Sequence, residues 1–166
     1  TIYNLYCSPV RSWEVVIGKA VPYIVISFVA YLLIFLLSVL FFEVRFTGSF
    51  LALTVSALLF LICTVGYGLL VSIIASSQLA AMFITILTTM LPSFFYSGFL
   101  SPVTSQSTLG QIISIFLPST YFMYIVRGIY LKGASFAIIW QDMFALLIYA
   151  AVLYFLAIRC FRKKVS

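Results

Sequence analysis

The stretch YSGFLSPVTSQSTLGQIISIFLPSTYFMYIVRGIYLKG, Tyr96 to Gly133, decides the fold of this chain. It lies between two long apolar runs, yet Pro102 and Pro118 break it, and Arg127 and Lys132 place charge near its end. The apolar pieces between these breaks are shorter than the ~20 residues that a helix needs to cross the hydrocarbon core of a bilayer. We therefore predict two short helices that dip into the membrane and return to the side from which they entered. Broken backbone at this depth needs protein or a water-filled cavity around it, which indicates a functional element.

The composition identifies the class of protein. Of 166 residues, 65% are hydrophobic and 7% are charged, whereas a soluble domain carries about 25% charged residues. The chain is therefore predicted to be an all-α integral membrane protein. Its net charge of +6 comes from basic residues at the ends of apolar runs, a pattern of membrane topology rather than of a nucleic-acid surface.

The apolar runs divide the chain into one transmembrane domain. We predict four transmembrane helices, together with a cytoplasmic amphipathic segment (residues 1–19), a re-entrant outer element (residues 101–133) and a short loop (residues 134–142). The four spans are residues 20–42, 50–76, 79–100 and 143–161. Pro92 is predicted to bend the third span, with Thr88 or Thr89 bonding the carbonyl groups that it frees.

The distribution of Lys and Arg predicts the orientation. With residues 1–19 in the cytoplasm, four crossings return the basic C-terminal tail to the cytoplasm, in agreement with the positive-inside rule. Both ends are then cytoplasmic in a multi-pass protein of the cell inner membrane. The cytoplasmic side holds Arg11, Lys19, Arg159, Arg162, Lys163 and Lys164, and the outer side holds Arg45, Arg127 and Lys132.

The first residues form an amphipathic piece. Ile2, Leu5 and Tyr6 share one helical face, Ser8-Pro9 ends that turn, and Glu14 falls in the first turn of the next helix. From residue chemistry alone, an ordinary interfacial helix is favoured over an element that docks on a partner. The chain starts at Thr1 in a polar, aromatic segment, and we expect it to be part of a longer protein.

The sequence lacks the patterns of common catalytic and metal sites. It has no phosphate-binding loop, no histidine and no pair of carboxylates within a span. The cysteines Cys7, Cys63 and Cys160 show no metal-binding spacing. We therefore expect no catalytic residue, no metal and no cofactor in this chain, and no enzymatic activity.

Two segments resemble one family. TIYNLYCSPVRSWEVVIGKAVPY (Thr1–Tyr23) is similar to the segment of type-2 ABC exporter permeases that docks on the partner ATPase and runs into the next transmembrane helix. The run from Tyr96 to Gly133 resembles the late signature of the same family, in the branch of bacterial drug and antibiotic exporters. The resemblance implies that this chain is the C-terminal part of a six-span permease.

The resemblance also implies residues and partners. It reverses the preference at the first segment, in favour of docking on a soluble ABC ATPase that binds ATP and Mg²⁺. It further implies a second permease subunit, a homodimer or heterodimer in the lipid bilayer, and no nucleic-acid partner. The coupling residues are then Leu5, Tyr6, Ser8, Pro9, Val10, Arg11, Trp13 and Glu14, and those of the outer gate are Tyr96, Gly98, Pro102, Pro118, Tyr121, Arg127 and Gly128.

Alternatives remain open. A non-transporting membrane scaffold or assembly subunit is the second hypothesis, and an intramembrane hydrolase using Ser93 or Ser97 the third, although no base is evident. Arg127 fits two roles equally well, a contact in the gate or a structural anchor that caps its helix or pairs with Asp142. The many Phe and Tyr residues are favoured as lipid-facing packing over cargo contacts.

Overall fold

The computed structural model describes residues 12–42, 48–134 and 136–165. These residues form helices and turns. The α-helices are α2 (Ser12–Leu40), α3 (Phe50–Ile74), α4 (Gln78–Thr85), α5 (Leu91–Tyr96), α6 (Thr108–Ile115), α7 (Pro118–Lys132) and α8 (Phe136–Val165). A π-helical turn (Ile86–Met90) joins α4 to α5, and a 3₁₀ turn (Val103–Ser105) precedes α6.

Four helical stretches are long and apolar enough to cross a membrane. They are Trp13–Leu40, Phe50–Ile74, Gln78–Tyr96 and Phe136–Phe161. The prediction of an all-α integral membrane protein is thereby confirmed, with four candidate spans by length and composition, or five if the bent pair of α6 and α7 forms one span.

Serine hydroxyls cap the helices that begin after loops. The side chains of Ser49, Ser77 and Ser107 accept hydrogen bonds from the third N–H that follows each of them, at 3.4, 3.2 and 3.4 Å. Pro118 opens α7, where a missing N–H costs nothing. Short polar linkers are therefore sufficient to start α3, α4 and α6.

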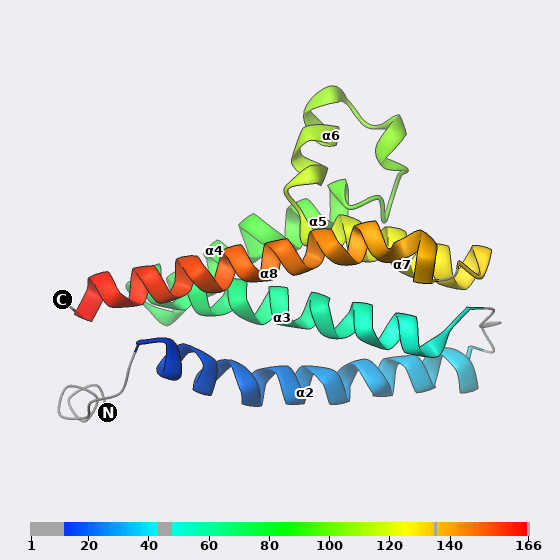
Figure 1. Ribbon diagram of the computed structural model, residues 1–166. Helices are drawn as coiled ribbons and strands as arrows, with labels where there is room; N and C mark the ends of the chain where they lie inside the picture. Colours follow the sequence, from blue (N-terminus) through cyan, green and yellow to red (C-terminus); the bar gives the residue numbers. More distant parts are fainter. Residues whose placement is uncertain (1–11, 43–47, 135, 166) are drawn as a thin grey trace.

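The centre of the molecule is the bundle of α2, α3, α7 and α8 (Figure 1). Helix α3 packs along α8 and also contacts α2 and α7. The side chains of Cys63, Ile125, Ile129 and Leu146 are fully buried where α3, α7 and α8 meet. The start of α2 and the end of α8 lie at the same end of the bundle.

A glycine makes room for an aromatic ring between α3 and α8. A Cβ atom at Gly66 would lie 2.7 Å from the ring of Tyr154. A larger residue at this position would have to displace this ring, and a small residue at a helix contact is what association in lipid favours.

The observed helix bounds correct one sequence prediction. The loop predicted for residues 134–142 is wrong beyond its first residues, because α8 already begins at Phe136 and includes Trp140 and Asp142. Burial of Ile139 and Met143 against α7 holds these turns helical. Helix α2 begins at Ser12 with Glu14 in its first turn, as the sequence predicts, and residues 12–19 continue directly into the span.

The third span contains a π-helical turn just before Pro92. The N–H of Leu91 donates to the carbonyl of Ile86, which gives one wide turn just before the proline. The hydroxyls of Thr88 and Thr89 donate to the carbonyls of Ile84 and Thr85. Both carbonyls belong to α4 and precede the wide turn. The prediction that the threonines bond the carbonyl freed by the proline is therefore wrong.

Candidate functional site

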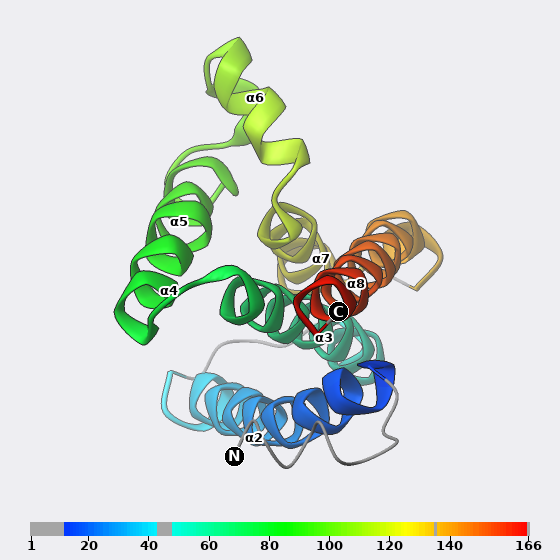
Figure 2. The same cartoon turned by 90° about the vertical axis from the view of Figure 1, so that its left-hand side faces the viewer.

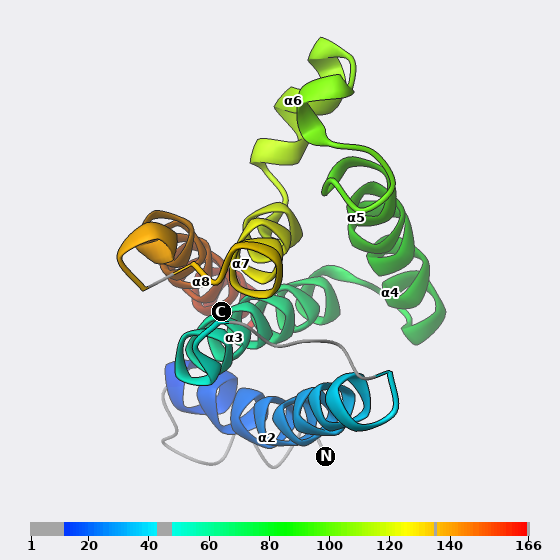
Figure 3. The same cartoon turned by 90° about the vertical axis from the view of Figure 1, so that its right-hand side faces the viewer.

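The broken element stands out from the side of the bundle. Helices α4–α5 and α7, which is itself part of the bundle, lie on either side of this element as the two legs of an arch, and α6 connects them farther from the bundle (Figures 2 and 3). The axes of α6 and α7 differ in direction by 89° across the break between Ile115 and Pro118. Two short helices therefore occupy the stretch, as the sequence indicated, while the return of the chain to its side of entry stays a prediction.

Two tyrosines hold the break between α6 and α7. The carbonyl oxygen of Ile115 accepts hydrogen bonds from the hydroxyls of Tyr121, at 3.1 Å, and Tyr149, at 2.5 Å. Their rings lie 5.9 Å apart. Since Tyr149 belongs to α8, this carbonyl ties the end of α6 to the main bundle.

Arg127 holds the other end of the broken element. Its Nη2 atom donates to the carbonyl of Gly98 at 2.5 Å, and lies 3.5 Å from that of Phe99. Gly98 ends the α5 leg with a φ of 89°, in the left-handed region that favours glycine. Arg127 and Asp142, which are both described, form no ion pair with each other, so the interactions of the Arg127 guanidinium seen here are those with backbone carbonyls.

The other predicted gate residues lie at separate points of the arch. Tyr96 is the last residue of α5, and a Cβ atom built on Gly110 of α6 would lie 3.2 Å from its ring. Pro102 precedes the 3₁₀ turn, and Pro118 opens α7. Gly128 lies on a different side of α7, facing Ile139 of α8. The structure therefore brings together Gly98 and Arg127 but does not gather the whole predicted set into one site.

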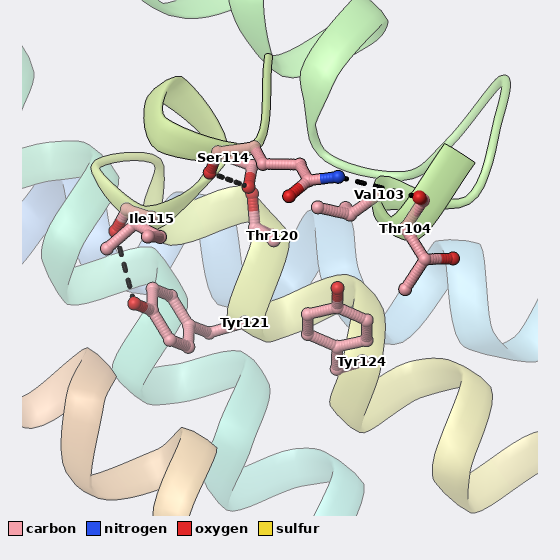
Figure 4. A pocket seen from close by; sticks show the side chains of 8 residues that line it. Val103, Thr104, Ser114, Ile115, Thr120, Tyr121 and Tyr124 are labelled. Atoms are coloured by element: carbon pink, nitrogen blue, oxygen red, sulfur yellow. Dashed lines mark hydrogen bonds between the residues drawn. The ribbon is translucent and has the colours of Figure 1, made fainter. Parts of the chain in front are cut away.

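A pocket of about 350 Å³ lies inside the broken element (Figure 4). Within it, the amide of Gln111 donates to the carbonyl of Gln106 at 3.1 Å and lies 3.5 Å from that of Thr104. Thr120 is 3% exposed, and its hydroxyl has no hydrogen-bond partner among the described residues. The pocket is lined by Val103, Thr104, Gln111, Ser114, Ile115, Thr120, Tyr121 and Tyr124.

An open apolar groove of about 730 Å³ runs between α2, α3 and α7. Among the described residues of its wall, the hydroxyls of Ser38 and Tyr130 lie 3.4 Å apart, and the Tyr31 hydroxyl lies 3.2 Å from that of Thr54, which does not line the groove. On the α7 side the ring of Phe122 stacks on that of Phe60 with centroids 4.5 Å apart.

A third hollow, less open than the other two and of about 300 Å³, lies between the two legs of the arch and the main bundle. We call it the inter-leg cavity. Residues of α3, of the π turn, of the α6–α7 break and of α8 contribute to its wall. Sequence reasoning did not find it, because no spacing pattern connects these distant segments.

Most of the predicted coupling residues lie outside the described residues. These are Leu5, Tyr6, Ser8, Pro9, Val10 and Arg11. Trp13 and Glu14 occupy the first turn of α2, and the side chain of Trp13 is 45% exposed. Because α2 is one continuous helix, a displacement of its first turn would be carried into the span.

Comparisons with known proteins give the family. Residues 2–159 match the model of the family described as ABC-2 family transporter protein. A probable multidrug ABC transporter permease of Escherichia coli K12, YbhR, is 32% identical over 165 residues, which are 99% of this chain and 45% of that relative. A second such permease, YbhS, is 31% identical over 133 residues, or 80% of this chain and 35% of that relative.

The inner membrane transport permease YhhJ of the same organism is 27% identical over 169 residues, covering 100% of this chain and 44% of YhhJ. The chain thus spans less than half the length of these curated relatives. No solved structure matches it. The match over nearly all of its residues agrees with the four apolar helices and the broken element, and the chain belongs to the ABC-2 family of transporter proteins.

Proposed function

We propose that this chain is part of the permease subunit of an ATP-driven exporter of the cell inner membrane. A separate soluble ATPase supplies the free energy, and a second permease subunit completes the pathway. The observation that carries the proposal is the family match over residues 2–159. It is supported by the four apolar helices, which provide the membrane body that such a subunit needs.

The proposed coupling begins at residues 5–14. Closure of the ATPase on ATP would push on this segment and hence on the first turn of α2, which carries Trp13 and Glu14. Helix α2 has 29 residues, so at 1.5 Å per residue it extends about 44 Å, enough to cross the bilayer. The movement would therefore reach the far side without a break in the helix.

The packing offers a route from α2 to the broken element. Helix α2 packs on α3, α3 packs on α8, and Tyr149 of α8 donates to Ile115 at the end of α6. A shift of α2 and α3 against α8 would thereby exert a force on the break between α6 and α7. In this proposal the broken element is the outer gate, held closed by the Arg127 contact to Gly98.

Coupled export in proteoliposomes tests the proposal. The complete protein, with its ATPase, is compared with a variant that carries Arg11→Glu and Pro9→Ala, and Arg45→Glu serves as a control at the opposite predicted side. We expect ATP-dependent export to fall by about tenfold or more in the double variant, because it changes two predicted docking residues and reverses the charge of one of them. Export should stay unchanged in the control. Unchanged export in the double variant would show that the docking assignment is wrong.

The scaffold hypothesis makes the opposite prediction. A scaffold subunit co-purifies with its partners, but no compound moves in an ATP-dependent manner when the whole complex is reconstituted. The family match favours export over this alternative.

A further inference from the structure

The wall of the inter-leg cavity is rich in hydroxyl groups. Phe60, Phe116, Leu117, Pro118 and Leu153 supply its apolar part. The hydroxyl-bearing residues are Thr64, Tyr67, Thr85, Thr88, Thr89, Ser93, Ser119 and Tyr149. No Asp, Glu, Lys or Arg is among the described residues that line it.

Almost all hydroxyl protons of this wall are donated in hydrogen bonds. On α3, Thr64 donates to the carbonyl of Leu61 at 3.0 Å. In the π-turn region, Thr85 donates to Ala81 at 2.8 Å, and Thr89 donates to Thr85 at 2.6 Å.

Two further hydroxyls donate across helices. Thr88 donates its own proton to Ile84, so Tyr67 must be the donor in the bond between the Tyr67 and Thr88 hydroxyls. Tyr149 donates to Ile115 outside the cavity.

Among the described hydroxyl-bearing residues of this wall, Ser93 is the one whose hydroxyl proton is not donated in a hydrogen bond. The hydroxyl of Ser119 donates to that of Ser93 at 2.8 Å, and Ser93 has no hydrogen-bond acceptor of its own among the described residues. A hydroxyl oxygen that has given away its proton still has lone pairs to accept a hydrogen bond. The cavity therefore presents several acceptors, a single donor and aromatic faces.

This inventory selects a class of ligand. An anion would need several donors, but one hydroxyl is available to it. A bare cation would lose its hydration without a carboxylate to replace it, which costs several kcal/mol. An uncharged group with O–H or N–H donors meets the acceptors at no such cost, and its apolar body meets the aromatic wall.

We propose that the inter-leg cavity binds an uncharged amphiphile through a ring-sized head that donates hydrogen bonds. The acceptors are the hydroxyl oxygens of Thr64, Thr89 and the other residues whose hydroxyl protons are already donated in hydrogen bonds. A volume of about 300 Å³ fits one substituted ring. The assignment rests on the proposed function, since it names the class of cargo. The site touches the π turn and the 89° bend at the α6–α7 break, so an occupant would affect the position of the two legs.

A matched series of four compounds tests the class directly. They are 4-butylphenol, 4-butylanisole, 4-butylbenzoate and 4-butylphenyl-trimethylammonium, which share a ring and a tail. Binding to the complete protein with its ATPase in nanodiscs, without ATP, is measured by calorimetry with empty nanodiscs subtracted. We expect the phenol to bind about five- to tenfold more tightly than its methyl ether, because only the phenol donates a hydrogen bond. The anion and the cation should show no saturable binding.

Variants locate the binding in the cavity. The double variant Thr64→Val/Thr89→Val removes two acceptors, and we expect it to reduce the preference for phenol over anisole to about twofold or less. Thr54→Val is the matched control, because Thr54 also lies on α3 but lines neither this cavity nor the groove. Melting curves confirm folding, and Thr64→Val alone replaces the double variant if that one unfolds.

The outcomes separate this proposal from the proposed function. Equal binding of phenol and anisole, preferential binding of the cation or the anion, or no binding at all would overturn the cavity assignment. Such a result leaves coupled export intact if ATP still drives another compound across the membrane. Conversely, phenol-selective binding without any ATP-driven transport supports the cavity assignment and contradicts the exporter.

Discussion

The hydroxyl of Tyr149 donates a hydrogen bond to the carbonyl of Ile115, which lies 34 residues earlier in the chain, at 2.5 Å. This bond joins α8, a long span of the bundle, to the end of the short helix α6. Tyr121 of α7 donates to the same oxygen. The direction in which the chain leaves α6 is therefore fixed by side chains of two other helices.

Replacement of both tyrosines should cost more than the sum of the single changes. Tyr149→Phe and Tyr121→Phe each leave one donor on the Ile115 carbonyl, so each should lower the free energy of unfolding by about 1 kcal/mol or less. The double variant leaves that carbonyl without either of these donors, so we expect it to cost more than the two single changes together. Unfolding in an SDS titration is compared for the original chain, both single variants and the double variant, which gives the coupling energy between the two changes. Strict additivity would show that the two bonds do not share a role.

A pair of neighbouring glycines on α3 tests the packing against α8. Gly66→Ala should destabilise by about 1–3 kcal/mol, because its new Cβ atom would lie 2.7 Å from the ring of Tyr154. Gly68→Ala is the control, since nothing lies within 4 Å of a Cβ atom there, and it should be neutral or raise stability by up to about 1 kcal/mol. The same SDS titration measures both. Equal effects of the two changes would contradict the close contact between Gly66 of α3 and Tyr154 of α8.

How far the sequence predicts this molecule depends on the range of the interactions. Charge-free runs of about 20 residues predict the spans, and Pro102 and Pro118 predict the break, since both effects are local. The start of α8 is not predicted, because the charge of Asp142 favours a loop, whereas packing of Ile139 and Met143 on α7 keeps this segment helical.

Contacts between distant segments are beyond local patterns. The partner of Arg127 cannot be read from spacing, because Arg127 binds backbone carbonyls at Gly98 and Phe99, and every residue has a carbonyl. Tyr149 gives no signal for the same reason, since its acceptor is the Ile115 carbonyl.

Arg127 and Asp142 should show no energetic coupling. Arg127→Met removes the bonds to the carbonyls of Gly98 and Phe99 and should cost about 1–3 kcal/mol of stability. Asp142→Asn should change stability by the same amount in the Arg127→Met background as in the original chain, because the two side chains form no ion pair within the described structure. A coupling above about 1 kcal/mol would mean that an Arg127–Asp142 pair forms after all.

Thr120→Val should be neutral or stabilising, unlike most changes of a buried residue. The hydroxyl of Thr120 is buried beside the pocket of Figure 4 and has no partner among the described residues, so its desolvation is uncompensated. Removing an unpaired buried hydroxyl and keeping the shape is expected to gain up to about 1–2 kcal/mol. Thr85→Val is the control, because it removes a hydroxyl that donates to Ala81 at 2.8 Å and should lower stability by about 1 kcal/mol. Thermal melts in detergent compare the two, and a loss of stability at Thr120→Val as large as at Thr85→Val would show that the Thr120 hydroxyl does have a partner, such as an ordered water.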